Sequence, residues 1–151
     1  MVFVDTGGWI AVNVASDSLH QVAQIYYEDL LSRRVPLFTS NFVLDETITR
    51  IRYDIGHAAA CRFCDLYQRA EEQHLVTTLW VDAAVTREAM QIFRKYSDQR
   101  FSLTDCTSFV VMRELRLTEA LTTDRHFRQM GFHILPGARR RATRLGRRQP
   151  H

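Results

Sequence analysis

Short apolar runs rich in β-branched residues alternate along this chain with longer stretches of helical period. Strands that alternate with helices form a mostly parallel sheet, because each crossover carries a helix back over the sheet. The sequence therefore predicts an α/β fold with a central, mostly parallel sheet. The candidate strands are residues 2–5, 36–39, 75–79, 119–123 and 132–135.

Apolar side chains recur at helical spacing between these strands. Further helices are predicted over residues 41–54, after Gly56, from the capping residue Ser102 and just before Gly131. After the first strand, Thr6-Gly7-Gly8 is expected to break regular structure. Two apolar stripes are predicted to face the core: Leu19, Val22, Ala23, Tyr26 and Leu30 on one helix, and Val81, Val85, Ala89, Ile92, Phe93 and Tyr96 on another.

The composition fits one globular domain followed by a basic tail. The 151 residues are 46% hydrophobic and 25% charged, enough for a single sizeable core. Residues 139–151 hold six arginines and no acid, and subtracting these charges from the net charge of +3 leaves −3 on residues 1–138. We predict a folded domain over residues 1–137 and a basic, disordered tail over residues 138–151.

The sequence predicts a cytoplasmic protein. Met1-Val2-Phe3-Val4 reads as a strand rather than a secretory signal, and no apolar run is long enough to span a membrane. The three cysteines are an odd number, which favours a reducing compartment over a disulfide framework.

Four acids stand where a predicted strand ends or a predicted helix begins: Asp5, Glu46, Asp105 and Asp124. Ligands of open α/β sheets bind at the carboxyl ends of the strands, so these acids are expected to form one cluster. A carboxylate cluster is unfavourable unless a cation neutralises it. Hard oxygen ligands with no accompanying His or thiolate set favour Mg²⁺ or Mn²⁺ over Zn²⁺.

Each of these acids also has a structural interpretation. Asp5 and Asp124 fit turn or cap positions, and Asp105 lies three residues after Ser102 in the first turn of its helix. Glu46 precedes Arg50 by four residues, which is the spacing of an exposed ion pair. What favours a common site is their joint occurrence at successive strand and helix ends.

The motifs around the acids resemble those of the PIN-domain family of metal-dependent ribonucleases, and within it the VapC-type toxins of bacterial toxin–antitoxin pairs. The resemblance covers about residues 2–136. Its motifs are Val4-Asp5-Thr6, Val43-Leu44-Asp45-Glu46-Thr47, Ser102-Leu103-Thr104-Asp105-Cys106 and Thr122-Thr123-Asp124-Arg125-His126-Phe127.

The resemblance implies a three-layer α/β/α sandwich that cleaves RNA with the help of a divalent metal. It implies a metal site of Asp5, Glu46, Asp105 and Asp124, with Thr6 and Thr104 as polar neighbours. Toxins of this type are commonly homodimers held inactive by a cognate antitoxin. Arg125 and His126, which flank Asp124, are candidates for binding substrate phosphate, and their structural alternative is a solvated helix start. The arginine-rich tail is a candidate for RNA contact through counterion release.

Three other functions remain open beside the toxin. The chain could be a stand-alone nuclease in RNA processing, or a non-catalytic RNA-binding module of the same fold. A phosphatase or phosphotransferase would require an Asp-x-Asp nucleophile motif or a nearby phosphate-binding lysine. Here Asp5 is followed by Thr6-Gly7, and Lys95, the one lysine, is distant in sequence from every acidic motif.

Overall fold

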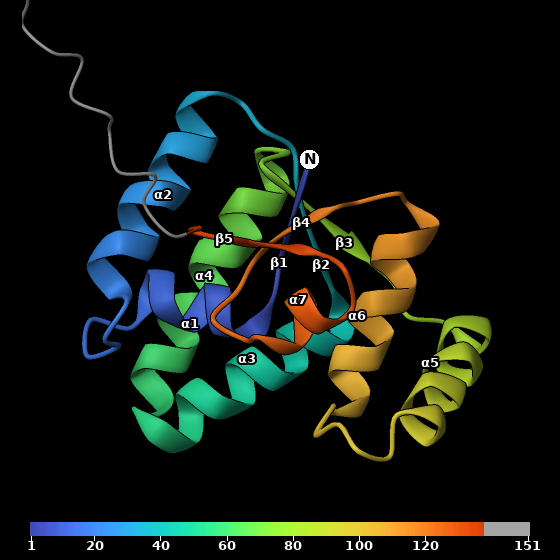
Figure 1. Ribbon diagram of the computed structural model, residues 1–151. Coiled ribbons are helices and arrows are strands. Elements are labelled where there is room, and N and C mark those ends of the chain that lie inside the picture. The colour runs from blue at the N-terminus through green and yellow to red at the C-terminus, as the bar shows by residue number, and fades with distance from the viewer. Residues whose placement is uncertain (138–151) are drawn as a thin grey trace, which may run out of the picture.

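In the computed structural model, which describes residues 1–137, a five-stranded sheet forms the centre of the molecule (Figure 1). Every pair of neighbouring strands is parallel, and their order is β3-β2-β1-β4-β5. The predicted α/β fold is therefore confirmed. The predicted tail at residues 138–151 lies outside the described residues, so the domain boundary stays a prediction. The strands are β1 (Val2–Val4), β2 (Leu37–Ser40), β3 (Val76–Leu79), β4 (Glu119–Leu121) and β5 (His133–Leu135).

Helices cover both faces of the sheet. Figure 1 shows α1, α2 and α4 on one side and α5 and α6 on the other, with α3 crossing near the strand ends. Within residues 1–137, no helix combines the length and apolar character needed to cross a membrane. The helices are α1 (Thr6–Asn13), α2 (His20–Ser32), α3 (Asn41–Asp54), α4 (His57–Glu72), α5 (Ala83–Lys95), α6 (Leu103–Glu114) and α7 (His126–Gln129).

Helix α1 corrects one prediction, because Thr6-Gly7-Gly8 begins a helix directly after β1 instead of breaking regular structure. The two glycines permit a close approach. A Cβ atom on Gly8 would overlap the backbone carbonyl of Leu121, and one on Gly7 would overlap the hydroxyl of Thr123. The glycines therefore let α1 pack against the end of β4, which outweighs their low helix propensity.

The two apolar stripes face the core only in part. On α2, Ala23 and Leu30 are buried, but Leu19 and Val22 are 42% and 48% exposed. On α5, Phe93 is 51% exposed, while the rest of the stripe is buried or partly buried. The prediction was wrong for Leu19, Val22 and Phe93, because each helix packs along a line narrower than its apolar stripe.

The strand order places the site. Helices α1 to α4 connect β1, β2 and β3 in one direction along the sheet, whereas the chain returns through α5 and α6 to β4 on the other side of β1. The gap between β1 and β4 is therefore a topological switch point, where ligands of open α/β sheets bind. Asp5 directly follows β1, and Asp124 lies three residues after β4.

A single methyl group on Gly8 should destabilise the fold. We expect Gly8→Ala to lower the free energy of unfolding by about 1–3 kcal/mol or more, because the added Cβ must displace the backbone of β4. Gly137→Ala is the control, since its Cβ would meet the nearest atom at 3.7 Å, and its effect should stay within about 0.5 kcal/mol. Urea denaturation measures both; equal stability of Gly8→Ala and the wild type would contradict the packing argument.

Candidate metal centre

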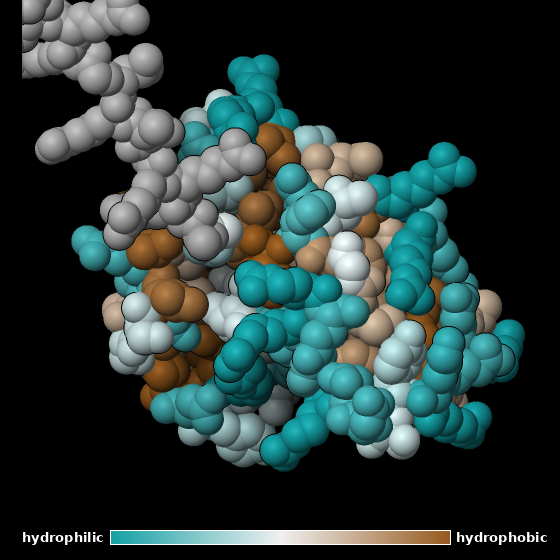
Figure 2. Space-filling view, viewed as in Figure 1, coloured by the Kyte–Doolittle hydropathy of each residue, from teal (hydrophilic) through white to brown (hydrophobic). Residues whose placement is uncertain are grey.

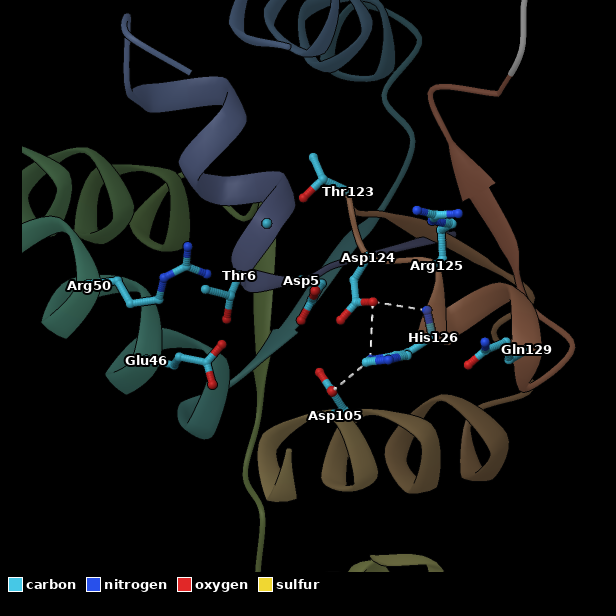
Figure 3. Close-up of a pocket in the computed structure, with 11 residues that line it drawn as sticks. Asp5, Thr6, Glu46, Arg50, Asp105, Thr123, Asp124, Arg125, His126 and Gln129 are labelled. Atoms are coloured by element: carbon cyan, nitrogen blue, oxygen red, sulfur yellow. Dashed lines mark hydrogen bonds and ion pairs between the residues drawn. The ribbon is translucent and has the colours of Figure 1, made fainter. Parts of the chain in front are cut away.

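A cleft of about 560 Å³ lies at the carboxyl ends of β1 and β4 (Figure 3). The structure brings all four predicted acids into it, together with Thr6 and Arg125. Thr104 is not among the lining residues; its backbone carbonyl accepts hydrogen bonds from the hydroxyls of Thr107 and Ser108. The lining residues are Asp5, Thr6, Gly7, Glu46, Arg50, Asp105, Thr123, Asp124, Arg125, His126 and Gln129.

Asp5 is the most deeply buried of the four acids, with only 4% of its surface exposed. Its position is fixed by the backbone, because its N–H donates to the carbonyl of Leu121 and its own carbonyl accepts from the N–H of Trp9. Burial, and next the negative charge of Asp105, raise the pKa of Asp5 to about 7. Burial and the neighbouring acid therefore both favour the protonated form of Asp5.

Thr122 connects Asp5 to Asp124 through one hydroxyl. Its Oγ1 donates to Oδ2 of Asp5 at 2.9 Å and accepts the N–H of Asp124 at 3.0 Å. Asp124 in turn accepts the N–H of His126 through Oδ1, also at 2.9 Å. The turn after β4 is thus tied to the end of β1, and its acid is held facing the cleft.

Asp105 has both of the roles that the sequence left open: it caps a helix, and it faces the cleft. It forms a capping box with Ser102, donating its N–H to the serine hydroxyl at 3.0 Å and accepting the serine N–H on Oδ2 at 2.9 Å. Asp105 is also buried and lines the cleft. Desolvation by burial raises its pKa, although the hydrogen bond from Ser102 opposes this. The cap fixes the carboxylate in one orientation.

Glu46 projects into the cleft from α3, whereas its neighbour Asp45 is exposed to solvent. Ser40 caps the helix by accepting the N–H of Val43, which sets the rotation of the first turn. The alternative interpretation paired Glu46 with Arg50. Both side chains line the cleft, but no ion pair joins them in the part of the chain that the structure describes.

His126, which the sequence offers with Arg125 as a candidate contact for substrate phosphate, lies next to two of the acids. Its Nδ1 lies 3.4 Å from Oδ2 of Asp105 and 3.2 Å from Oδ1 of Asp124. Among the His, Cys, Asp and Glu side chains of residues 1–137, these three form the group close enough to share one ion. The sequence does place His126 two residues after Asp124, but this spacing alone does not show where the imidazole points.

The donors of the cleft fit a divalent cation. Two buried polar atoms, Oγ1 of Thr6 and Nδ1 of His126, have no hydrogen-bond partner within residues 1–137, and both belong to the lining of the cleft. Buried polar groups are normally satisfied, so two such atoms in one lining suit a cleft that accepts a polar or charged ligand. The carboxylate oxygens beside them are the ligands that hard divalent cations prefer.

Comparison with known proteins places this geometry in a family. The PIN-domain family model matches residues 2–133. The chain belongs to the PIN-domain family. The three-layer sandwich that the sequence predicted is the architecture of this PIN domain, as the structural comparison confirms.

Two relatives of this PIN domain are ribonucleases. The chain is 31% identical over 132 residues to the 23S rRNA-specific endonuclease VapC20 of Mycobacterium tuberculosis, a match covering 87% of this chain and 95% of the relative. It is 33% identical over 82 residues to a VapC ribonuclease of Archaeoglobus fulgidus, covering 54% of this chain and 49% of that protein. The crystal structure of VapC20, described as a Sarcin-Ricin loop cleaving toxin, superposes with a TM-score of 0.75 at 30% identity, covering 87% and 96% of the two chains.

The raised pKa of Asp5 predicts how stability depends on pH without a divalent cation. The carboxyl group releases its proton near pH 4 in the unfolded chain and near pH 7 in the folded chain. The folded state therefore holds the extra proton between these values, and the free energy of unfolding falls as pH rises from about 4 to about 7. Above that range the loss is complete.

Asp5→Asn tests this dependence. In the presence of EDTA, the fall in unfolding free energy between pH 5 and pH 8 should be about 1–3 kcal/mol smaller in the variant than in the wild type. The asparagine oxygen can still accept the Thr122 hydroxyl, so the main change is the lost charge. Urea denaturation at the two pH values measures the difference, and parallel falls would contradict the assignment to Asp5.

Proposed function

We propose that this PIN domain is an endoribonuclease that hydrolyses RNA phosphodiester bonds with Mg²⁺ or Mn²⁺. The observation that carries the proposal is the convergence of four carboxylates, from four separate parts of the chain, on one cleft. The ribonuclease activities of its VapC relatives support the proposal. A surface that only bound RNA would gain nothing from concentrated negative charge, which disfavours the non-catalytic alternative.

Asp5, Glu46, Asp105 and Asp124 are the proposed metal-holding residues. A divalent cation there would activate a water molecule and neutralise charge that develops on the phosphate during hydrolysis. The protein supplies the orientation. The capping box fixes Asp105, and the hydroxyl of Thr122 holds the end of β1 and the turn after β4 together.

Two arginines on different walls of the cleft are proposed to bind the RNA backbone. Figure 3 shows Arg50 beside Thr6 and Glu46 on one side and Arg125 on the opposite side. Neither makes an ion pair within residues 1–137 that would occupy its guanidinium group. Phosphates adjacent to the one that is cleaved would then contact Arg50 and Arg125, with Thr6 near the reacting group. The substrate-binding role predicted for Thr104 is not tested by the structure and stays a prediction.

We further propose that the protein is the toxin of a cytoplasmic toxin–antitoxin pair and that it works as a homodimer. The structurally similar VapC20 is a toxin, which supports this assignment over a stand-alone processing nuclease. An apolar groove of about 400 Å³ between α1, α3 and α4 offers a surface for a protein partner, and Figure 2 shows hydrophobic residues on that side of the molecule. The groove is lined by Asn13, Val14, Ala15, Ser16, Ile51, Ile55, Ala59, Arg62, Phe63 and Leu66.

Substitution of neighbouring acids on α3 tests the nuclease. Purified protein should cut RNA in the presence of Mg²⁺ or Mn²⁺ and not in EDTA. Glu46→Gln should lower the cleavage rate by about 100-fold or more, because it removes a charge that faces the cleft. Asp45→Asn is the matched control, since this acid is exposed one residue away, and it should cut at nearly the wild-type rate.

The same assay includes Asp5→Asn and Asp105→Asn, which should abolish cleavage while circular dichroism shows an intact fold. RNA cleavage that persists in EDTA would refute the metal-dependent mechanism. Equal losses in Glu46→Gln and Asp45→Asn would refute the assignment of the site to the inner face of α3.

The basic tail yields a separate prediction, which concerns residues outside the described range. Truncation after Gly137 removes six arginines and should weaken RNA binding most at low salt. Each lost phosphate contact should reduce the slope of log affinity against log salt by about 0.7 for single-stranded RNA. Fluorescence anisotropy at several salt concentrations measures the slope, and an unchanged slope would show that the tail makes no RNA contact.

A further inference from the structure

We propose that His126 is a nitrogen ligand of the divalent cation, shared with Asp105 and Asp124, and that its imidazole makes the site prefer a first-row transition metal such as Mn²⁺ over Mg²⁺. The inference rests on the proposed metal-dependent function and goes beyond it by naming a donor outside the four acids. It also assigns the metal preference to one side chain.

The distances between the three side chains are close to the ligand separations around one ion. In octahedral coordination with ligands about 2.1 Å from the ion, neighbouring ligands lie about 3 Å apart and opposite ligands about 4.2 Å apart. The Nδ1 atom of His126 is 3.4 Å from an Asp105 oxygen and 3.2 Å from an Asp124 oxygen. Donor atoms of all three residues lie within 4.8 Å of one another. Small side-chain shifts would bring them to ligand separations.

The imidazole nitrogen faces the carboxylates of Asp105 and Asp124 at ion-pair distance, which is where a shared cation would bind. Nδ1 of His126 is buried and forms no hydrogen bond within residues 1–137, because neither nearby carboxylate oxygen has suitable geometry. Thr6 gives a second, independent indication of a ligand in the same cleft: its side chain is 2% exposed, and its hydroxyl also has no partner. Figure 3 shows the His126 ring directed between Asp105 and Asp124.

The ring is held in this orientation from two sides. Its edge-to-face contact with Phe101 has a centroid distance of 5.0 Å, and the backbone N–H of His126 donates to Asp124. The first contact limits rotation of the ring, and the second fixes the main chain relative to a neighbouring donor. A ligand that is already oriented loses little conformational freedom on binding a metal.

A nitrogen donor changes which cations the site favours. Mg²⁺ prefers oxygen ligands and retains much of its water shell, so it gains little from an imidazole. Imidazole is a favoured ligand of several first-row transition metals, whose affinity for a mixed nitrogen and oxygen site rises from Mn²⁺ along the series. The competing explanation is that His126 only positions Asp105 and Asp124 without touching the ion, and a spectroscopic measurement separates the two.

The experiment uses the full chain with ¹⁵N-labelled histidine and Mn²⁺ as the probe. Electron spin echo modulation should show a histidine nitrogen coupled to bound Mn²⁺, with the frequency change expected on ¹⁵N labelling. His126→Phe keeps an aromatic ring beside Phe101 and should abolish this coupling. The matched control is His133→Gln, which alters an exposed histidine on β5 and should leave the coupling unchanged.

Affinity provides a second measurement on the same proteins. His126→Phe should weaken Mn²⁺ binding by at least about tenfold, because losing even outer partners of metal ligands costs about 10–100-fold. Its Mg²⁺ affinity, measured by competition with Mn²⁺, should change by much less.

The outcomes separate this inference from the proposed function. Mn²⁺ binding and RNA cleavage without histidine coupling in the wild type would overturn the inference and leave the nuclease intact, whether or not His126→Phe folds. Coupling that persists in His126→Phe would overturn it as well. Absence of any Mn²⁺ or Mg²⁺ binding, together with absence of metal-dependent cleavage, would refute the proposed function and the inference with it.

Discussion

The carboxylate of Asp5 is buried where β1 and β4 meet, and much of the surrounding structure follows from accommodating it. The chain supplies one hydroxyl donor, from Thr122, and surrounds the acid with further negative charge. Burial of a charge without an opposite charge is unfavourable, so the carboxyl pKa rises. A divalent cation bound beside Asp5 would offset both the cost of burying the charge and the repulsion from Asp105.

The four acids are held in different ways, which explains why each of them has a structural interpretation. Asp105 completes a capping box, Asp124 accepts the N–H of His126, and Glu46 is placed by the rotation of α3. A local role and a place in the site are therefore compatible. The hydrogen bonds that fix a cap also fix the direction of its carboxylate, so the helix starts serve as supports for the cleft.

Much of the fold was predictable because its determinants are local. All five strands lie within or next to the predicted ranges, since short β-branched runs between helical stretches identify them directly. The acids were found by the same logic, as residues that follow strands or begin helices. The family resemblance selected Glu46 rather than its neighbour Asp45 as the acid of the site. The exposure of Asp45 to solvent agrees with that selection.

The features that the sequence did not reveal depend on contacts between distant segments. Gly7 and Gly8 read as a break, because the strand that presses against them lies more than 110 residues later. Leu19 and Val22 were predicted to be buried, because periodicity shows which side of a helix is apolar but not how much of that side contacts the core. The imidazole of His126 reaches Asp105 only once α6 and α7 are side by side.

The pairing of β1 with β4 has a consequence for synthesis of the protein. Phe3 pairs in register with Ala120, so β1 finds one of its two neighbours only after more than a hundred further residues have been made. Asp5 and Asp124 are separated in the same way. The complete acidic centre therefore cannot assemble on a growing chain until the turn after β4 has been made.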